Sequence, residues 1–163
     1  MIIRTAKPAE MTSRERAAFI AFVSGAGEVG AATLPALVAQ AAALVTLHDG
    51  PALVGTAAIK APSDAHRCGE FRKAKAGGQA DAYPLELGWV VVDPAYRRRG
   101  HARALVAAAM AAVPGQGVYA TTKTGQMRKM LPEHGFAVQG EPYPSVLTPE
   151  VALTLFGRPS QAP

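Results

Sequence analysis

The chain has little cysteine, few aromatic residues and no long apolar run. Cys68 is the only cysteine among 163 residues, which excludes an internal disulfide and any cysteine-rich zinc site. The four histidines show neither HxxH nor HExxH spacing, so we predict no metal. The longest apolar stretches, such as residues 41–47, fall far short of the roughly 20 residues that cross a bilayer, so we predict no membrane segment.

The composition is that of a globular protein, because 49% of the residues are hydrophobic and 18% are charged. A chain of this length is most simply one domain, so we expect a single domain over residues 1–156 and a frayed tail over residues 157–163. Arg4 and Lys7 follow the first residues directly, without the apolar core of a signal peptide. This favours a cytoplasmic location.

The net charge of +5 is compatible with nucleic acid, a membrane surface or an anionic cofactor. Much of it lies in two groups, one of Arg97, Arg98, Arg99 and Arg103 and one of Lys123, Arg128 and Lys129. Neither group has the interleaved aromatic residues of a single-strand binder or the length of a basic arm. A local anion site is therefore favoured over a nucleic-acid surface.

Periodicity and turn residues predict alternating strands and helices. The predicted strands are residues 1–4, 44–48, 52–60, 85–92, 117–122, 136–140 and 151–156. A capping box at Thr12 and Glu15 begins a helix that ends near Gly25, and further helices are predicted over residues 31–43, 102–113 and 124–134. Residues 61–84 are too long for a simple turn, so they form either a mobile loop or a small structure of their own.

Residues 25–30 formally match GxGxxG, the glycine pattern of dinucleotide-binding folds, and Asp49 lies where the ribose-binding acid would be. Two features count against that function. The capping box makes residues 13–23 a helix instead of the required strand, and Pro35 falls inside the helix that would follow the glycines. We therefore interpret residues 25–30 as a loop between two helices.

The most informative segment is the turn that follows the apolar strand at residues 85–92. Its sequence is Arg97-Arg98-Arg99-Gly100-His101-Ala102, and a helix begins within it. The small residues let a large anion approach the main chain, where free N–H groups point at one place. Arginines and the positive end of the helix favour a pyrophosphate. The segment predicts a phosphorylated cofactor.

Arg97-x-x-Gly100-x-Ala102 resembles the Q/R-x-x-G-x-G/A motif of the GNAT superfamily of acyl-CoA N-acyltransferases. The context is similar as well, since Val-Asp-Pro-x-Tyr-Arg precedes the motif and a helix follows it. Within the superfamily, four segments resemble a bacterial subgroup: Gly27-Glu28-Val29, Ala57-Ala58-Ile59-Lys60, Ala120-Thr121-Thr122 and His134-Gly135-Phe136. The resemblance covers nearly the whole chain.

The resemblance implies a single α/β domain with a mixed, mostly antiparallel sheet of about six or seven strands and about four helices. The sheet is expected to splay between residues 85–92 and 117–122, with acetyl-CoA in the opening. The main chain of Val90, Val91 and Val92 would hold the pantetheine arm. The pyrophosphate would meet Arg97, Arg98, Arg99, Gly100, His101, Ala102 and Arg103.

Amide formation from a thioester needs a base for the ammonium proton and hydrogen-bond donors for the oxyanion. Glu86 is the candidate base, because it is a carboxylate inside an apolar strand and matches the catalytic glutamate of the histone-acetyltransferase branch. The alternative is a glutamate that faces solvent or pairs with a lysine. A strand amide near Val91 would be the oxyanion donor.

One part of the family pattern is missing. Many members have a tyrosine that protonates the leaving thiolate, and Leu131 stands at that position. Tyr119, Tyr143 or a water remains as the proton donor, or the thiolate leaves unassisted. On the acceptor side, Glu28, Asp64 and Asp81 are candidates for holding a cationic amine, and Arg67, Arg72 and Lys73 for a carboxylate or phosphate, although ordinary solvated charges are favoured for all six.

The function that the sequence favours is an N-acetyltransferase acting on a small amine, a peptide N-terminus or a lysine. A catalytically weak acyl-CoA sensor is the first alternative, since the usual tyrosine is missing. An acetyltransferase directed at RNA, such as a charged tRNA, is the second. A homodimer is left open, and the acceptor itself is not identified.

Overall fold

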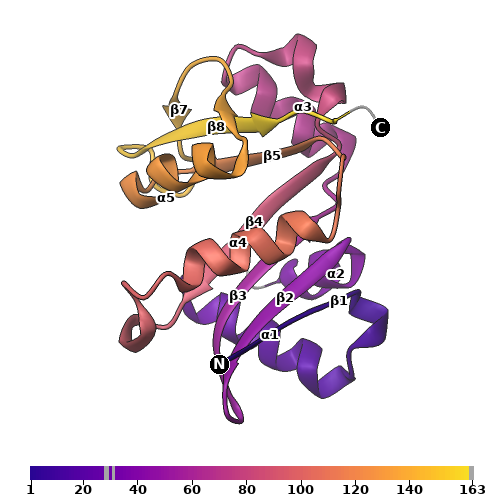
Figure 1. The fold of residues 1–163 in the computed structure, drawn as a ribbon. Helices are drawn as coiled ribbons and strands as arrows, with labels where there is room; N and C mark the ends of the chain where they lie inside the picture. The colour runs from indigo at the N-terminus through magenta and orange to yellow at the C-terminus, as the bar shows by residue number, and fades with distance from the viewer. Residues whose placement is uncertain (28–29, 31, 162–163) are drawn as a thin grey trace. The chain divides into compact units, whose positions relative to one another are not determined.

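The chain forms a mixed α/β fold, and the computed structural model describes residues 1–27, 30 and 32–161 (Figure 1). Eight strands lie in the described residues, hydrogen-bonded in the order β1-β2-β3-β4-β5-β8-β6, with β7 paired to β8. The pair β4–β5 is parallel. The pairs β1–β2, β2–β3, β5–β8, β6–β8 and β7–β8 are antiparallel. The predicted fold class is confirmed.

Two compact units divide the chain. The first consists of Met1–Ala61 and Leu87–Pro114, and the second of Pro62–Glu86 and Gly115–Pro163. The strand β4, Leu85–Val92, covers the predicted residues and runs through both units, because its first two residues belong to the second unit and the others to the first. The single domain predicted over residues 1–156 stays a prediction.

The first unit begins with β1, Ile2–Ala6, beside a hairpin of β2, Ala43–Asp49, and β3, Ala52–Lys60. Gly50 and Pro51 form the turn between β2 and β3, and Gly50 has φ +55°, a conformation that glycine adopts without strain. Most residues of β2 and β3 are buried in continuous runs, so both strands lie in the interior of the unit. A bulge between Leu47 and His48 shifts the register of this pair by one residue.

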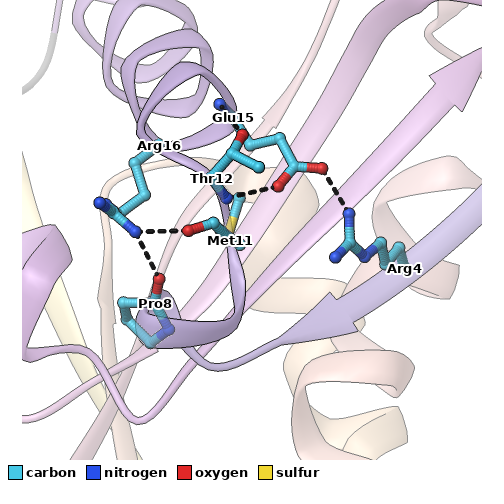
Figure 2. Close-up of polar contacts among 6 residues, drawn as sticks. All are labelled: Arg4, Pro8, Met11, Thr12, Glu15 and Arg16. Atoms are coloured by element: carbon cyan, nitrogen blue, oxygen red, sulfur yellow. Dashed lines mark hydrogen bonds and ion pairs between the residues drawn. The ribbon is translucent and has the colours of Figure 1, made fainter.

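The predicted capping box begins α1, Ser13–Gly25 (Figure 2). The Glu15 amide donates to the Thr12 hydroxyl at 3.1 Å, and the Glu15 carboxylate accepts from the Thr12 amide at 2.7 Å. Arg4 of β1 pairs with the same carboxylate, and Arg16 donates to the main-chain carbonyls of Pro8 and Met11. The short 3-10 helix η1, Pro8–Glu10, precedes this cap.

Helices cover both faces of the first unit's strands. On one face α1 and α2, Leu34–Gln40, pack against a core that includes Phe19, Leu44 and Trp89. On the other face α4, His101–Ala111, packs against β1, β2 and β3, with Leu105 close to Gly55. The helix α2 is shorter than predicted. Pro35 lies in its first turn, the one place where a helix accepts proline readily.

Residues 61–84 were predicted to be either a mobile loop or a small structure of their own, and they form the latter. All of them except Ala61 belong to the second unit. The helix α3, Asp64–Lys73, is capped by Ser63, whose hydroxyl accepts from the His66 amide at 3.2 Å. The 3-10 helix η2, Gly77–Ala82, follows it. The sequence pattern did not predict α3, because polar residues outnumber apolar ones in this helix and only Phe71 is buried.

The remaining elements of the second unit are β5, Val118–Thr122, α5, Gly125–Met130, η4, Leu131–His134, β6, Ala137–Val138, β7, Tyr143–Pro144, and β8, Ala152–Arg158. Pro132 turns the end of the predicted helix over residues 124–134 into the 3-10 helix η4. The strand β6 is shorter than predicted, β7 was not predicted, and β8 extends two residues beyond its predicted end. The core of this unit surrounds Phe71, Tyr119 and Leu155.

No helix in the described residues is long and apolar enough to span a bilayer. The formal GxGxxG pattern includes Glu28 and Val29, which lie outside the described residues. Its first glycine, Gly25, is the last residue of α1, which agrees with a helix instead of a strand before the pattern. The residue that precedes a dinucleotide-binding glycine turn belongs to a strand, so this part of the pattern is absent.

Candidate active site

The turn between β4 and α4 has two residues in the left-handed conformation, Arg98 with φ +63° and Gly100 with φ +81°. The 3-10 helix η3, Pro94–Tyr96, precedes them and is capped by Asp93, whose carboxylate accepts from the Ala95 amide at 2.8 Å. Arg97 folds back, and its Nε donates to the Val92 carbonyl at 3.1 Å. These bonds fix both ends of the turn.

The main-chain N–H groups of residues 98–102 have no hydrogen-bond acceptor in the described part of the chain. On either side of this run, the Arg97 N–H donates to the Pro94 carbonyl at 3.4 Å and the Ala104 N–H donates to the Gly100 carbonyl at 3.1 Å. A Cβ at Gly100 would meet nothing within 4 Å, so space is open beside the main chain. Free N–H groups, arginine side chains and a helix start together suit a phosphate group.

Tyr96 links this turn to the hairpin between β2 and β3. Its hydroxyl donates to the Asp49 carboxylate at 2.8 Å, and the Arg99 guanidinium lies 5.7 Å from the centre of its ring. The hydrogen bond to Asp49 raises the pKa of Tyr96 above its usual value. A rigid hairpin therefore helps to hold the residues from which the arginines project.

In the middle of β4, Trp89 adopts φ +50°, which is rare for a bulky residue and marks local strain. The buried hydroxyl of Thr56 donates to its carbonyl at 2.9 Å, and Phe19 packs edge-on against its ring at 6.2 Å. Trp89 is thus a core residue. Val90 and Val91 beyond it are half-buried, whereas Val92 is buried.

The candidate base Glu86 is buried, with 6% of its surface exposed. The Tyr119 hydroxyl donates to its Oε2 at 3.1 Å, and the His66 Nε2 lies 3.8 Å from the same oxygen. All three residues belong to the second unit. The structure therefore places Glu86 in a polar cluster inside the unit, and not on a solvent-facing surface.

A second carboxylate is paired with a tyrosine in the same unit. The Tyr143 hydroxyl donates to Glu70 of α3 in a short hydrogen bond, and Lys73 lies 3.2 Å from the other oxygen of that carboxylate. Glu70 and His66, the two α3 residues that pair with these polar groups, were not predicted from the sequence. Their spacing of four residues, which puts two side chains on one face of a helix, was the available signal.

Both tyrosines of these pairs are held in the neutral form. Burial raises the pKa of Tyr119 far above its usual value, and the charge and hydrogen bond of Glu86 raise it further. Burial also raises the pKa of Tyr143 strongly, with a second contribution from its hydrogen bond to Glu70. Each phenol is therefore a hydrogen-bond donor at neutral pH and a weak acid.

The charged residues predicted for the acceptor side pair largely with one another. Arg67 lies 3.1 Å from Asp64 and 3.5 Å from Asp81, so these two carboxylates neutralise a guanidinium of their own unit. Glu28 lies outside the described residues. Leu131, which stands at the position of the usual tyrosine, is fully buried and belongs to the core.

The sequence profile of the family described as "Acetyltransferase (GNAT) family" matches residues 31–136. The chain belongs to this family. The predicted enzyme class, an acyltransferase, is thereby confirmed, as is the suspected superfamily. GNAT enzymes use acyl-CoA as the donor, so the predicted class of cofactor is confirmed at that level, while the acetyl group itself stays a prediction.

Solved GNAT structures share this fold at low sequence identity. Escherichia coli ElaA is 16% identical, with a TM-score of 0.67 over 96% of this chain and 98% of that one. The ribosomal-protein-S18-alanine N-acetyltransferase from Escherichia coli is 14% identical, with a TM-score of 0.68 over 99% and 97%. An aminoglycoside 6'-N-acetyltransferase complexed with coenzyme A is 13% identical, with a TM-score of 0.65 over 100% and 99%. No curated protein matches this GNAT chain in sequence.

Proposed function

We propose that this GNAT enzyme transfers the acetyl group of acetyl-CoA to a primary amine on a small molecule, a peptide N-terminus or a lysine. The amine attacks the thioester directly and passes through a tetrahedral intermediate. The observation that carries the proposal is the run of N–H groups at residues 98–102 without internal acceptors, at the start of α4 in a family member.

Acetyl-CoA binds through its pyrophosphate to that turn. Residues 98–102 supply main-chain N–H groups, the arginines among residues 97–103 supply charge, and the open space beside Gly100 lets the phosphates reach the main chain. Hydrogen bonds to charged groups contribute roughly 1.5–3 kcal/mol each, and micromolar binding requires about 8 kcal/mol in total. Several such bonds are therefore needed, together with main-chain bonds from Val90, Val91 and Val92 to the pantetheine arm.

Glu86 is the general base that removes the proton of the acceptor ammonium. Its burial and its hydrogen bond from Tyr119 support this role, because they hold one carboxylate in a defined orientation. The alternative of a solvent-facing glutamate is not supported by that burial. A main-chain amide near Val91 is the donor proposed for the oxyanion.

The thiolate of coenzyme A takes its proton from water or leaves without help. Tyr119 and Tyr143 already donate to carboxylates, and their raised pKa values make them poor acids. Leu131 has no proton to donate. Of the proton donors that the sequence left open, which are Tyr119, Tyr143 and water, water is therefore favoured.

The test is an acceptor screen with acetyl-CoA, read as release of free coenzyme A. The panel contains a diamine, a lysine peptide and a peptide with a free alanine N-terminus. Glu86→Gln is expected to lower kcat by about 10²-fold or more, with the Kd for coenzyme A little changed. Glu70→Gln is the matched control, since it also removes the charge of a tyrosine-bonded carboxylate, and it is expected to keep most of the activity.

Two results would contradict the proposal. If coenzyme A binds and no amine in the panel or in a broader extract of metabolites is acetylated, the chain is the acyl-CoA sensor. If Glu86→Gln turns over at the wild-type rate, Glu86 is not the base, although transfer itself would stand.

A further inference from the structure

A base with little access to water needs a route by which its proton leaves. The side chain of Glu86 is only 8% exposed, so a proton taken from an ammonium group does not pass to bulk water freely. Each catalytic cycle adds one proton to this carboxylate. Turnover therefore depends on a neighbouring group that accepts the proton and exchanges it with solvent.

His66 has the required chemistry and position. Its imidazole lies on α3 with 51% of its side chain exposed, and its Nε2 is 3.8 Å from Oε2 of Glu86. Histidine commonly shuttles protons in proteins, because its imidazole has two ring nitrogens that accept and donate a proton. The backbone of His66 is held in place, because its amide donates to the Ser63 hydroxyl.

We propose that His66 relays to solvent the proton that Glu86 takes from the acceptor amine. This inference rests on the proposed function. The N–H bond of the ammonium breaks as the Glu86 carboxylate becomes a carboxylic acid. Its O–H bond then breaks as the neutral imidazole of His66 takes the proton, and the imidazolium releases it to water. The nitrogen loses its second proton as the tetrahedral intermediate collapses, and through water this proton ends on the thiolate. The products are therefore the amide, coenzyme A as a thiol and the one proton released by His66, so charge and atoms balance.

Tyr119 contacts the same oxygen of Glu86 but does not serve as the exit. It is fully buried, and its hydrogen is already donated to the carboxylate. Passing a proton through it would require phenolate formation, which burial and the Glu86 charge oppose. Its role is to orient Glu86, whereas His66, which lies near the same oxygen, is half-exposed and reaches water.

The distance of 3.8 Å exceeds that of a direct hydrogen bond. A half-exposed ring has room to rotate towards Oε2, and one bridging water would also complete the path. Charged and titratable groups near this path include Glu70 and Tyr143, with Lys73 paired to Glu70, and Asp64 and Arg67 beside His66 on α3. Tyr143 is held neutral, and Glu70, Lys73, Asp64 and Arg67 form charge pairs.

The experiment compares His66→Gln and His66→Ala with the wild type, using acetyl-CoA and the amine that gives the highest rate in the panel. In dilute buffer both variants are expected to lose about tenfold in kcat, less than the loss expected for removal of the base, because water partly replaces the relay. KM for both substrates should stay unchanged. Added imidazole should restore kcat in His66→Ala, where the ring has left space.

His48→Ala is the matched control, because His48 is a partly exposed histidine at the end of β2 in the other unit. It should show the wild-type rate and no response to imidazole. Circular dichroism and urea unfolding verify that each variant is folded. A loss of kcat in His66→Ala that neither imidazole nor a higher buffer concentration restores would overturn the relay, since a structural role alone gives that result.

Wild-type kcat in both His66 variants at every buffer concentration would overturn it as well, provided that Glu86→Gln has lost activity in the same assay. If Glu86→Gln and the His66 variants all keep wild-type activity, the relay and the role of Glu86 as the base are both overturned. The two failures are therefore distinguishable by the Glu86 variant.

Discussion

Glu86 and Tyr119 are register partners on the two parallel strands β4 and β5, and the tyrosine hydroxyl donates to the carboxylate at 3.1 Å. The register of two adjacent strands thus positions the candidate base. Strands are rigid supports, and a catalytic group held by one keeps its orientation better than a group on a loop.

Tyr119→Phe removes the hydroxyl and leaves the Glu86 carboxylate buried without this hydrogen bond. Because a hydrogen bond to a charged group contributes about 1.5–3 kcal/mol, the free energy of unfolding should fall by about that amount. Urea denaturation measures the change. Tyr83→Phe is the control, since no hydrogen bond of the Tyr83 hydroxyl is present in the described residues, and it should change stability by less than about 0.5 kcal/mol. Equal effects of the two substitutions would contradict this prediction.

Stability should fall at high pH, because folding holds Tyr119 and Tyr143 in the neutral form. Above pH about 10 the unfolded chain loses phenolic protons that the folded chain keeps, so its free energy drops relative to the folded state. The free energy of unfolding should then decrease by up to about 1.4 kcal/mol per pH unit for each of the two phenols.

Urea denaturation between pH about 9 and about 11 measures that slope, and ultraviolet absorbance follows phenolate formation in the folded protein. Tyr119→Phe should make the slope shallower. A slope that is the same in the wild type and in Tyr119→Phe would show that this phenol ionises equally in both states.

Gly100→Ala tests the phosphate turn. A Cβ there would project into the open space beside the main chain, where the pyrophosphate is proposed to bind, and the left-handed conformation would cost roughly 1–2 kcal/mol. We expect the Kd for coenzyme A to rise by about tenfold or more, the equivalent of at least about 1.4 kcal/mol. Isothermal titration calorimetry measures it.

Gly50→Ala is the matched control for that substitution. Gly50 has φ +55° in the β2–β3 turn and also has open space around it, so the strain is similar while no phosphate is proposed there. Both variants should lose similar stability, and only Gly100→Ala should bind coenzyme A more weakly. Equal affinities in the two variants would argue against binding at the turn.

Leu131→Tyr should not restore a proton donor. Leu131 is fully buried in the core of the second unit, so a larger side chain with a hydroxyl would overpack it at a cost of about 1–3 kcal/mol. Thermal and urea unfolding measure the loss, and Leu131→Met, of similar volume, should cost less than about 1.5 kcal/mol. A stable Leu131→Tyr variant with a raised kcat would instead show that the tyrosine position is available for catalysis.

Local patterns were enough to predict the parts of the fold whose signals lie within a few residues. The capping box at Thr12 and Glu15 forms as predicted, since a cap involves residues only three apart. The hairpin turn at Gly50 and Pro51 is equally local. The helix α3 and the strand β7 were missed, because a polar helix with a single buried residue and a strand of two residues have no clear period.

The sequence by itself determined the turn at residues 97–102, because glycine, arginine and a helix start act over one short stretch of chain. It also singled out Glu86, a charge in an apolar strand. Only the tertiary structure decided which side chains meet that carboxylate. Tyr119 is 33 residues from Glu86 and reaches it through the pairing of β4 with β5. His66 reaches it through the position of α3. Such contacts depend on how distant segments pack, and no local pattern encodes that.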